Sequence, residues 1–187
     1  GVGAMSTAEA VGLARHAKKA GADAVMVVGP YYEEPTEDEL RDYVAAIAGD
    51  GGLPVLLYNN PAGTGYNLST QFIAELSRMP EVVAIKDTTH QAARIEEIRH
   101  LCGKRVQILS GQDTLQYVGF VSGARAAVWG APNAVPAACA ALFERIVTRG
   151  DLIGGRKLWG RLYPVNRFLE AEGYVASVKA GAQIRGV

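Results

Sequence analysis

Residues 54–60 read PVLLYNN, and residues 81–88 read EVVAIKDT. Each stretch contains a short, nearly continuous apolar run, which is typical of a parallel strand buried on both faces. Each run ends on a side chain that can do chemistry, Tyr58 in the first and Lys86 in the second. The two stretches therefore predict parallel strands whose carboxyl ends carry a functional site.

The same pattern continues along the chain as an alternation of strands and helices. The predicted strands are Ala24–Val28, Pro54–Tyr58, Val82–Lys86, Val106–Leu109 and Ala126–Trp129. The predicted helices are Thr7–Ala20, Glu37–Ala48, Ser69–Met79, Gln91–Cys102 and Asp113–Val121, then about Val135–Thr148, Asp151–Phe168 and Val175–Ile184. Thr36 and Glu39 have the spacing of a capping box, and Gly21 stands where a helix-terminating glycine belongs. The order of elements indicates an α/β protein.

Two folds accommodate this alternation, the open doubly wound sheet and the closed (β/α)8 TIM barrel. The doubly wound fold usually carries a glycine-rich phosphate loop, and Gly1-Val-Gly3 does not complete one. The barrel gathers reactive side chains at the carboxyl ends of its strands, as seen here, and is favoured. Five strands make it incomplete, with about strands 4–8 and the helices that follow. Residues 1–187 are interpreted as one partial catalytic domain in which 151–187 begin a C-terminal helical region. The chain is expected to open on a loop, without the first three strands.

Composition narrows the class of partner. The chain has 19 Lys plus Arg and 19 Asp plus Glu, so a formal net charge of zero gives no electrostatic case for nucleic acid or an anionic membrane. No apolar stretch is long enough to span a bilayer. Cys102 and Cys139 match no metal or redox spacing. We expect a cytoplasmic protein that binds a small molecule and needs neither metal nor cofactor.

Lys86 is the first candidate catalytic residue. A lysine that ends so apolar a run is expected to be partly buried, and burial favours the neutral amine, a nucleophile toward carbonyl carbons. The alternative is a lysine whose stem packs on the rim while its head reaches solvent. Tyr58 can shuttle protons beside it, or can simply cover the core with its ring. Thr88, Gly111 and Asp113 are candidate substrate contacts, whereas helix capping would also explain the threonine and the aspartate.

Four motifs together resemble the dihydrodipicolinate synthase/N-acetylneuraminate lyase family. They are Gly29-Pro-Tyr-Tyr-x-x-Pro35, Tyr58-Asn-x-Pro-x-x-Thr-Gly65, Ile85-Lys-Asp87 and Ser110-Gly-x-Asp113. The resemblance implies a (β/α)8 barrel, usually a homotetramer, in which Lys86 forms an imine with pyruvate or a related 2-oxo acid. It further implies that Tyr58 moves protons and contacts the keto acid. Tyr32 resembles the tyrosine that a neighbouring subunit inserts into a proton relay, and Val128 resembles a residue whose main chain lies near the pyruvate.

The resemblance also bears on the substrate. Synthases of the lysine pathway usually carry an arginine where this chain has Gly63, and glycine cannot hold a carboxylate as a guanidinium does. Thr88 and the loop that ends at Tyr66 look more like 2-keto-3-deoxygluconate aldolases and neuraminate lyases, and Thr114 argues against sialic acid. The prediction is an aldolase for a 2-keto-3-deoxy sugar acid. The alternatives are 4-hydroxy-tetrahydrodipicolinate synthase, a 2-oxo acid dehydratase or deaminase, and an inactive partial barrel that only associates with other chains.

Overall fold

The computed structural model describes residues 1–187, and its strands are hydrogen-bonded in chain order, β1-β2-β3-β4-β5. The strands are β1 (Val25–Val28), β2 (Val55–Asn59), β3 (Val82–Asp87), β4 (Gln107–Ser110) and β5 (Ala126–Ala127). The helices are α1 (Thr7–Lys19), α2 (Glu37–Gly51), α3 (Pro61–Thr64), α4 (Thr70–Leu76), α5 (Ala93–Cys102), α6 (Gln116–Val121), α7 (Pro136–Phe143), α8 (Leu152–Ala171) and α9 (Tyr174–Ile184). The predicted alternation is confirmed. The chain divides into two compact units, Gly1–Leu109 and Ser110–Val187.

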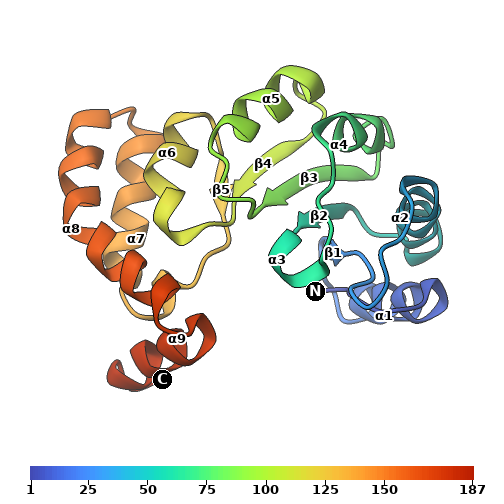
Figure 1. Cartoon of the computed structure of the whole chain (residues 1–187), viewed down its shortest axis with the longest axis horizontal. Coiled ribbons are helices and arrows are strands. Elements are labelled where there is room, and N and C mark those ends of the chain that lie inside the picture. Colours follow the sequence, from blue (N-terminus) through green and yellow to red (C-terminus); the bar gives the residue numbers. More distant parts are fainter. The chain divides into compact units, whose positions relative to one another are not determined.

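In the first unit, helices α1, α2, α4 and α5 pack on one face of the sheet (Figure 1). In β1 and β2, every second residue is buried against them, including Val25, Val27, Val55 and Leu57. The residues between these, such as Leu56 and Tyr58, are only half-buried. The prediction of strands buried on both faces is therefore wrong for β1 and β2, because the helices of this unit cover one face only.

The pairing of β2 with β3 positions the strand ends. Val55 pairs with Val82, but the next residue, Leu56, pairs with Ala84. The register therefore shifts by one residue at this point, and Val83 is left without a partner in β2. Beyond this shift the strands run in parallel register to the pair Tyr58 and Lys86. Because successive strand residues point to opposite faces, Tyr58 and Lys86 lie on the face away from the helices.

The first residues of the chain extend the sheet beyond β1. Val2 forms a parallel bridge with Val27, its amide donating to the Met26 carbonyl at 2.7 Å and its carbonyl accepting from the Val28 amide at 3.2 Å. Val2 is also buried. The expectation that the chain opens on a loop is wrong at this residue, because a single valine flanked by glycines gives no strand signal on its own.

The second unit is mainly helical. Helices α6, α7 and α8 enclose a core that includes Phe120, Leu142, Trp159 and Leu162. Three predicted elements differ from the structure. The helix predicted from Asp113 begins as a 3-10 turn and is α-helical only from Gln116, the fifth strand ends at Ala127, and α7 continues from Glu144 as a π-helical turn.

Candidate active site

Lys86 and Tyr58 lie side by side at the carboxyl ends of β3 and β2. Lys86 is 7% exposed, and its Nζ lies 3.9 Å from the centroid of the Tyr58 ring. Lys86 takes part in none of the ion pairs of the chain. The predicted adjacency is confirmed, and the alternative of a lysine whose head reaches solvent is not what the structure shows. A buried amine without a carboxylate partner can attack a carbonyl carbon.

Asn60 directly follows β2, and Thr88 directly follows β3. The Thr88 hydroxyl donates to the main-chain carbonyl of Asn59 at 2.8 Å, and the Asn60 carboxamide oxygen lies 3.3 Å from it. Thr88 does not cap α5, which begins at Ala93 without a side-chain cap. Its predicted contact with substrate stays a prediction, and its observed role is to join the ends of β2 and β3.

The loop after Asn60 begins with the short helix α3, whose first residue is Pro61. A Cβ atom on Gly63 would lie 2.4 Å from the Asn60 Nδ2, so a larger side chain there would require the Asn60 side chain to move. The Asn60 side chain thus packs over Gly63.

Tyr32 lies in the segment between β1 and α2. It is 85% exposed, and its hydroxyl has no hydrogen-bond partner within the chain. The capping box predicted just after it is confirmed, since Thr36 Oγ1 accepts from the Glu39 amide and the Glu39 carboxylate accepts from the Thr36 amide. The capping box thus fixes the start of α2, after the segment that carries the exposed Tyr32.

The second unit carries the other predicted substrate-binding residues. Asp113 is 1% exposed, and its carboxylate accepts hydrogen bonds from the Gly130 amide at 3.1 Å, the Ala131 amide at 2.8 Å and the Tyr174 hydroxyl at 2.7 Å. It does not cap its own helix, which was the alternative considered from the sequence. The Val128 amide donates to the Ser110 carbonyl at 3.1 Å, and Gly111 is half-buried. The substrate roles of these three residues remain predictions.

Glu170 is a polar partner in this unit that was not predicted from the sequence. Its carboxylate accepts from the Thr114 amide at 2.9 Å and from the Thr114 hydroxyl at 2.7 Å. It also accepts from the Gln112 carboxamide. These contacts join α8 to the segment after β4, over more than fifty residues of sequence, a separation that no local pattern bridges.

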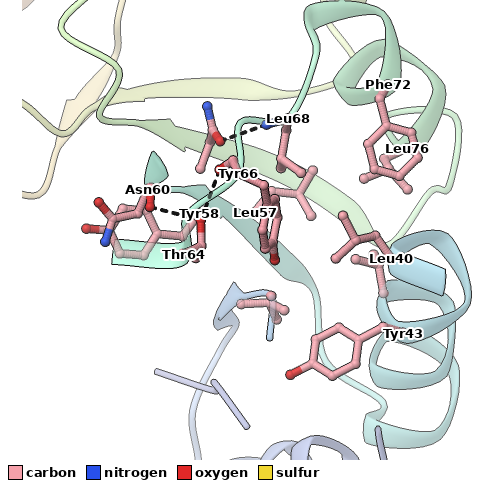
Figure 2. Close-up of a pocket in the computed structure, with 14 residues that line it drawn as sticks. Leu40, Tyr43, Leu57, Tyr58, Asn60, Thr64, Tyr66, Leu68, Phe72 and Leu76 are labelled. Carbon is pink, nitrogen blue, oxygen red and sulfur yellow. Dashed lines mark hydrogen bonds between the residues drawn. The ribbon is translucent and has the colours of Figure 1, made fainter. Parts of the chain in front are cut away.

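Figure 2 shows a cavity in the first unit, with Leu57 of β2 facing Leu40 and Tyr43 of α2. Its volume of about 20 Å³ holds roughly one water molecule, so it cannot admit a 2-oxo acid. The Tyr66 hydroxyl is buried here without a partner, and burial raises the pKa of Tyr66 to about 12. This cavity is a packing feature on the helix side of the sheet, whereas Lys86 lies on the opposite face.

The structure shows neither a metal-binding cluster nor a membrane-spanning helix. No cluster of three or more His, Cys, Asp and Glu side chains is arranged to hold a metal ion. None of the helices has the length and apolar character that crossing a membrane requires. Neither finding identifies a reaction, so the comparison with known proteins carries that step.

The model of the dihydrodipicolinate synthetase family matches residues 1–187. The chain belongs to this family. The 4-hydroxy-tetrahydrodipicolinate synthases of Thermodesulfovibrio yellowstonii and Geobacter sulfurreducens are 34% and 36% identical to it over 186 residues. These matches cover all of this chain and 64% of each relative. The chain therefore spans less than two thirds of the length of these curated family members.

Solved structures of family members share the fold of this chain over its whole length. Dihydrodipicolinate synthase from Aquifex aeolicus superimposes with a TM-score of 0.94 at 32% identity, covering 100% of this chain and 64% of that one. The chloride-inhibited synthase from Acinetobacter baumannii, solved with pyruvate, gives 0.94 at 31% identity with the same coverage. The predicted fold, an incomplete (β/α)8 barrel, is confirmed by these likenesses and by the parallel strand order.

Proposed function

We propose that the complete protein forms an imine between Lys86 and pyruvate or a related 2-oxo acid, and makes or breaks a carbon–carbon bond through it. The observation that carries this proposal is the buried Lys86 amine against the Tyr58 ring at paired strand ends. Membership of the dihydrodipicolinate synthetase family supports it, as does the likeness to a family structure solved with pyruvate.

The chemistry follows from the amine and the phenol. Lys86 Nζ attacks the ketone carbon, and the carbinolamine loses water to give a protonated imine. That cation accepts the electron pair released when a carbon–carbon bond breaks, which leaves an enamine; in the reverse direction the enamine carbon attacks an aldehyde. Tyr58 accepts and returns the protons that these steps exchange.

Among the candidate reactions, 4-hydroxy-tetrahydrodipicolinate synthesis has the broadest support. The curated relatives cited above carry that name at 34% and 36% identity. We therefore place the synthase ahead of the sugar-acid aldolase that the loop motif predicted. In this reaction the enamine of pyruvate condenses with an aldehyde that bears a carboxylate.

A 2-keto-3-deoxy sugar acid aldolase is the second candidate, favoured by Gly63 and Asn60. The Asn60 carboxamide packs over Gly63, where an arginine would provide a charged fork for the carboxylate of the aldehyde. A neutral amide suits a hydroxylated aldehyde better, because it can donate to and accept from hydroxyl groups. A dehydratase or deaminase would use the same imine, and an inactive associating fragment would form none.

We further propose that the complete protein assembles as a homo-oligomer, a tetramer by family resemblance, in the cytoplasm. The exposed Tyr32 ring fits a role in which a neighbouring subunit receives it. Light scattering coupled to size exclusion measures the assembly. A monomer that keeps full activity would contradict the role proposed for Tyr32.

Reduction of the protein with borohydride in the presence of pyruvate tests the proposed function. Peptide mapping should find the pyruvate-derived mass on Lys86 in the wild type and nowhere in Lys86→Met, while Lys104→Arg, at an exposed lysine, should label as the wild type does. An active enzyme with unlabelled Lys86 would overturn the proposal. Assays with a carboxylate-bearing aldehyde and with 2-keto-3-deoxy sugar acids then separate synthase from aldolase, and product analysis reveals elimination.

A further inference from the structure

A second polar pair lies directly behind Lys86 and Tyr58, on the helix side of the same strands. Asn59 follows Tyr58 and Asp87 follows Lys86, and these two residues pair with each other in the register of β2 and β3. Because successive side chains alternate between faces, Asn59 and Asp87 point away from the reactive pair. Both are buried.

Arg94 of α5 completes this group. The Asp87 Oδ2 accepts from the Asn59 Nδ2 at 2.9 Å, from the Arg94 Nη2 at 3.2 Å and from the Arg94 Nε at 3.3 Å. Its Oδ1 accepts from the Thr89 amide at 3.1 Å. The other ion pairs of the chain lie at more exposed positions, so this is its buried ion pair. We call Asn59, Asp87 and Arg94 the strand-end clamp.

The strand-end clamp also holds the segment that follows α3. The Asn59 Oδ1 accepts from the Leu68 amide at 3.1 Å, while its Nδ2 donates to the Asn67 Oδ1 at 2.8 Å. The Arg94 Nη2 donates to the Leu68 carbonyl at 2.8 Å. Both hydrogens of the Asn59 amide and both carboxylate oxygens of Asp87 are thereby used. The clamp joins β2, β3, α5 and the segment between α3 and α4.

Stability alone is a poor explanation for such a group. Desolvation of two charges offsets most of their attraction, and well-packed apolar residues often replace a buried ion pair without loss of stability. What a fully satisfied polar network does supply is one defined geometry. Displacing a reacting group by about 1 Å can slow a reaction roughly a hundredfold.

We propose that Asn59, Asp87 and Arg94 are positioning residues that fix Lys86 and Tyr58 in the geometry needed for imine formation. This inference rests on the proposed function. Each clamp residue on a strand adjoins a reactive residue in the chain, so a shift of Asp87 or Asn59 moves Lys86 or Tyr58 with it. Arg94 acts through the other two, from the helix side of the sheet.

The test compares two arginines of α5 in the complete protein. Arg94→Met and Arg94→Lys remove the fork of the clamp, while Arg99→Met, which removes an exposed partner of Glu96, is the matched control. We expect the rate of borohydride labelling at saturating pyruvate to fall about tenfold to a hundredfold in Arg94→Met, less in Arg94→Lys and not at all in Arg99→Met. The pyruvate concentration for half-maximal labelling should change little, because the clamp lies on the face away from the substrate.

A double variant separates positioning from stability. Asp87→Leu with Arg94→Met removes both charges, so its thermal midpoint should recover relative to Arg94→Met, while its labelling should stay slow. Labelling that recovers together with the midpoint, or that is as fast in Arg94→Met as in Arg99→Met, would overturn the inference.

The acetylation rate of Lys86 by a small amine-reactive reagent is a readout that needs no imine. It should change several-fold in the clamp variants, and an unchanged rate would also overturn the inference. An unlabelled wild type whose Lys86 acetylation still responds to Arg94 would overturn the proposed function and leave the positioning role standing.

Discussion

The hydroxyl group of Tyr58 and its aromatic ring have separate roles, and a substitution by phenylalanine removes only the hydroxyl. The centroid of the ring lies 3.9 Å from Lys86 Nζ, a contact that a phenylalanine would preserve. Only the hydroxyl can carry protons between the imine, the carbinolamine and the enamine. Its removal therefore tests chemistry without disturbing the packing of the lysine.

Tyr58→Phe should lower turnover about 10²- to 10⁴-fold, because a positioned acid–base group contributes that much. Borohydride labelling of Lys86 should remain detectable, since the amine is intact. Steady-state kinetics with peptide mapping measure both, and Tyr31→Phe, at an exposed tyrosine, serves as the control. Turnover equal to that of the wild type would exclude Tyr58 as the acid–base.

Two other tyrosines make a contrasting pair. The Tyr43 hydroxyl donates to the Ala4 carbonyl at 3.1 Å and accepts from the Ala4 amide at 3.3 Å, whereas the buried Tyr66 hydroxyl has no partner. Leaving a buried polar group unsatisfied costs about 1–3 kcal/mol. The same substitution should therefore have opposite effects at the two positions.

Tyr66→Phe should leave the free energy of unfolding unchanged or raise it by about 1 kcal/mol, and Tyr43→Phe should lower it by about 1–3 kcal/mol. Burial raises the pKa of Tyr66 to about 12 in the native state, while an unfolded tyrosine ionises near pH 10. The native state of the wild type thus loses stability as the pH rises from about 10 toward 12, and Tyr66→Phe lacks this loss. Urea unfolding at several pH values measures it; a destabilised Tyr66→Phe would show that the hydroxyl has a partner.

At the scale of elements, the start of α2 depends on one carboxylate. Glu39 accepts from the amide and from the hydroxyl of Thr36, each at 2.8 Å, and these hydrogen bonds lower the pKa of Glu39. Because the native pKa of Glu39 is lowered, its ionised carboxylate stabilises the folded state. This stabilisation is fully present above the ordinary pKa of about 4.5 and is lost as the pH falls through the native pKa.

Glu39→Gln should flatten the acid limb of the stability curve below about pH 4.5, because a carboxamide keeps a hydrogen bond without titrating. Urea unfolding at several values between about pH 3 and about pH 7 measures the slope. Glu34→Gln, at an exposed residue outside the helix, should keep the wild-type slope. Equal slopes in the two variants would contradict the account of the capping box.

Elements with a strong local pattern were predictable, and those without one were not. The strand ends at Tyr58 and Lys86 follow from apolar runs that stop at a polar residue, and their adjacency follows from parallel pairing. Helix α3 has only four residues, two of them Pro61 and Gly63, and so presents no periodic pattern. Strand β5 consists of only two residues, both alanines, instead of the predicted Ala126–Trp129, and alanine has a low strand propensity.

The polar network of the site illustrates the same limit. Asp87 is a visible part of the lysine motif, but its partner Arg94 lies seven residues on and its partner Asn59 twenty-eight residues back. Both contacts depend on strand register and on the placement of α5. The sequence predicted Lys86 and Tyr58 as the reactive pair, whereas the contacts of Asp87 with Asn59 and Arg94 become visible only in three dimensions.

At the scale of the whole molecule, hydrogen bonds between distant segments hold each unit together. In the second unit, Asp113 joins the segment after β4 to residues 130–131 and to α9 through three accepted hydrogen bonds. Burial and the hydrogen bond to Asp113 raise the pKa of Tyr174, so its hydroxyl stays a donor over the physiological range. Asp113 therefore organises this unit, whatever else it contacts.

Asp113→Ala should lower the free energy of unfolding by about 3 kcal/mol or more, because it leaves three buried or half-buried donors without their acceptor. Hydrogen exchange should speed up within residues 110–187, above all at the Gly130 and Ala131 amides. Mass-resolved exchange measures this, with Glu172→Ala, at an exposed residue of the same unit, as the control. Unchanged protection at residues 130–131 would contradict the assignment.

The central claim is that Lys86 is the nucleophile and that Tyr58 stands beside it when the 2-oxo acid is bound. A crystal structure of the complete protein soaked with pyruvate tests this claim most directly. The account predicts continuous density from Lys86 Nζ to the second carbon of pyruvate, with the Tyr58 hydroxyl in contact with the adduct. Pyruvate bound without a covalent link, or linked to any other lysine, would contradict it.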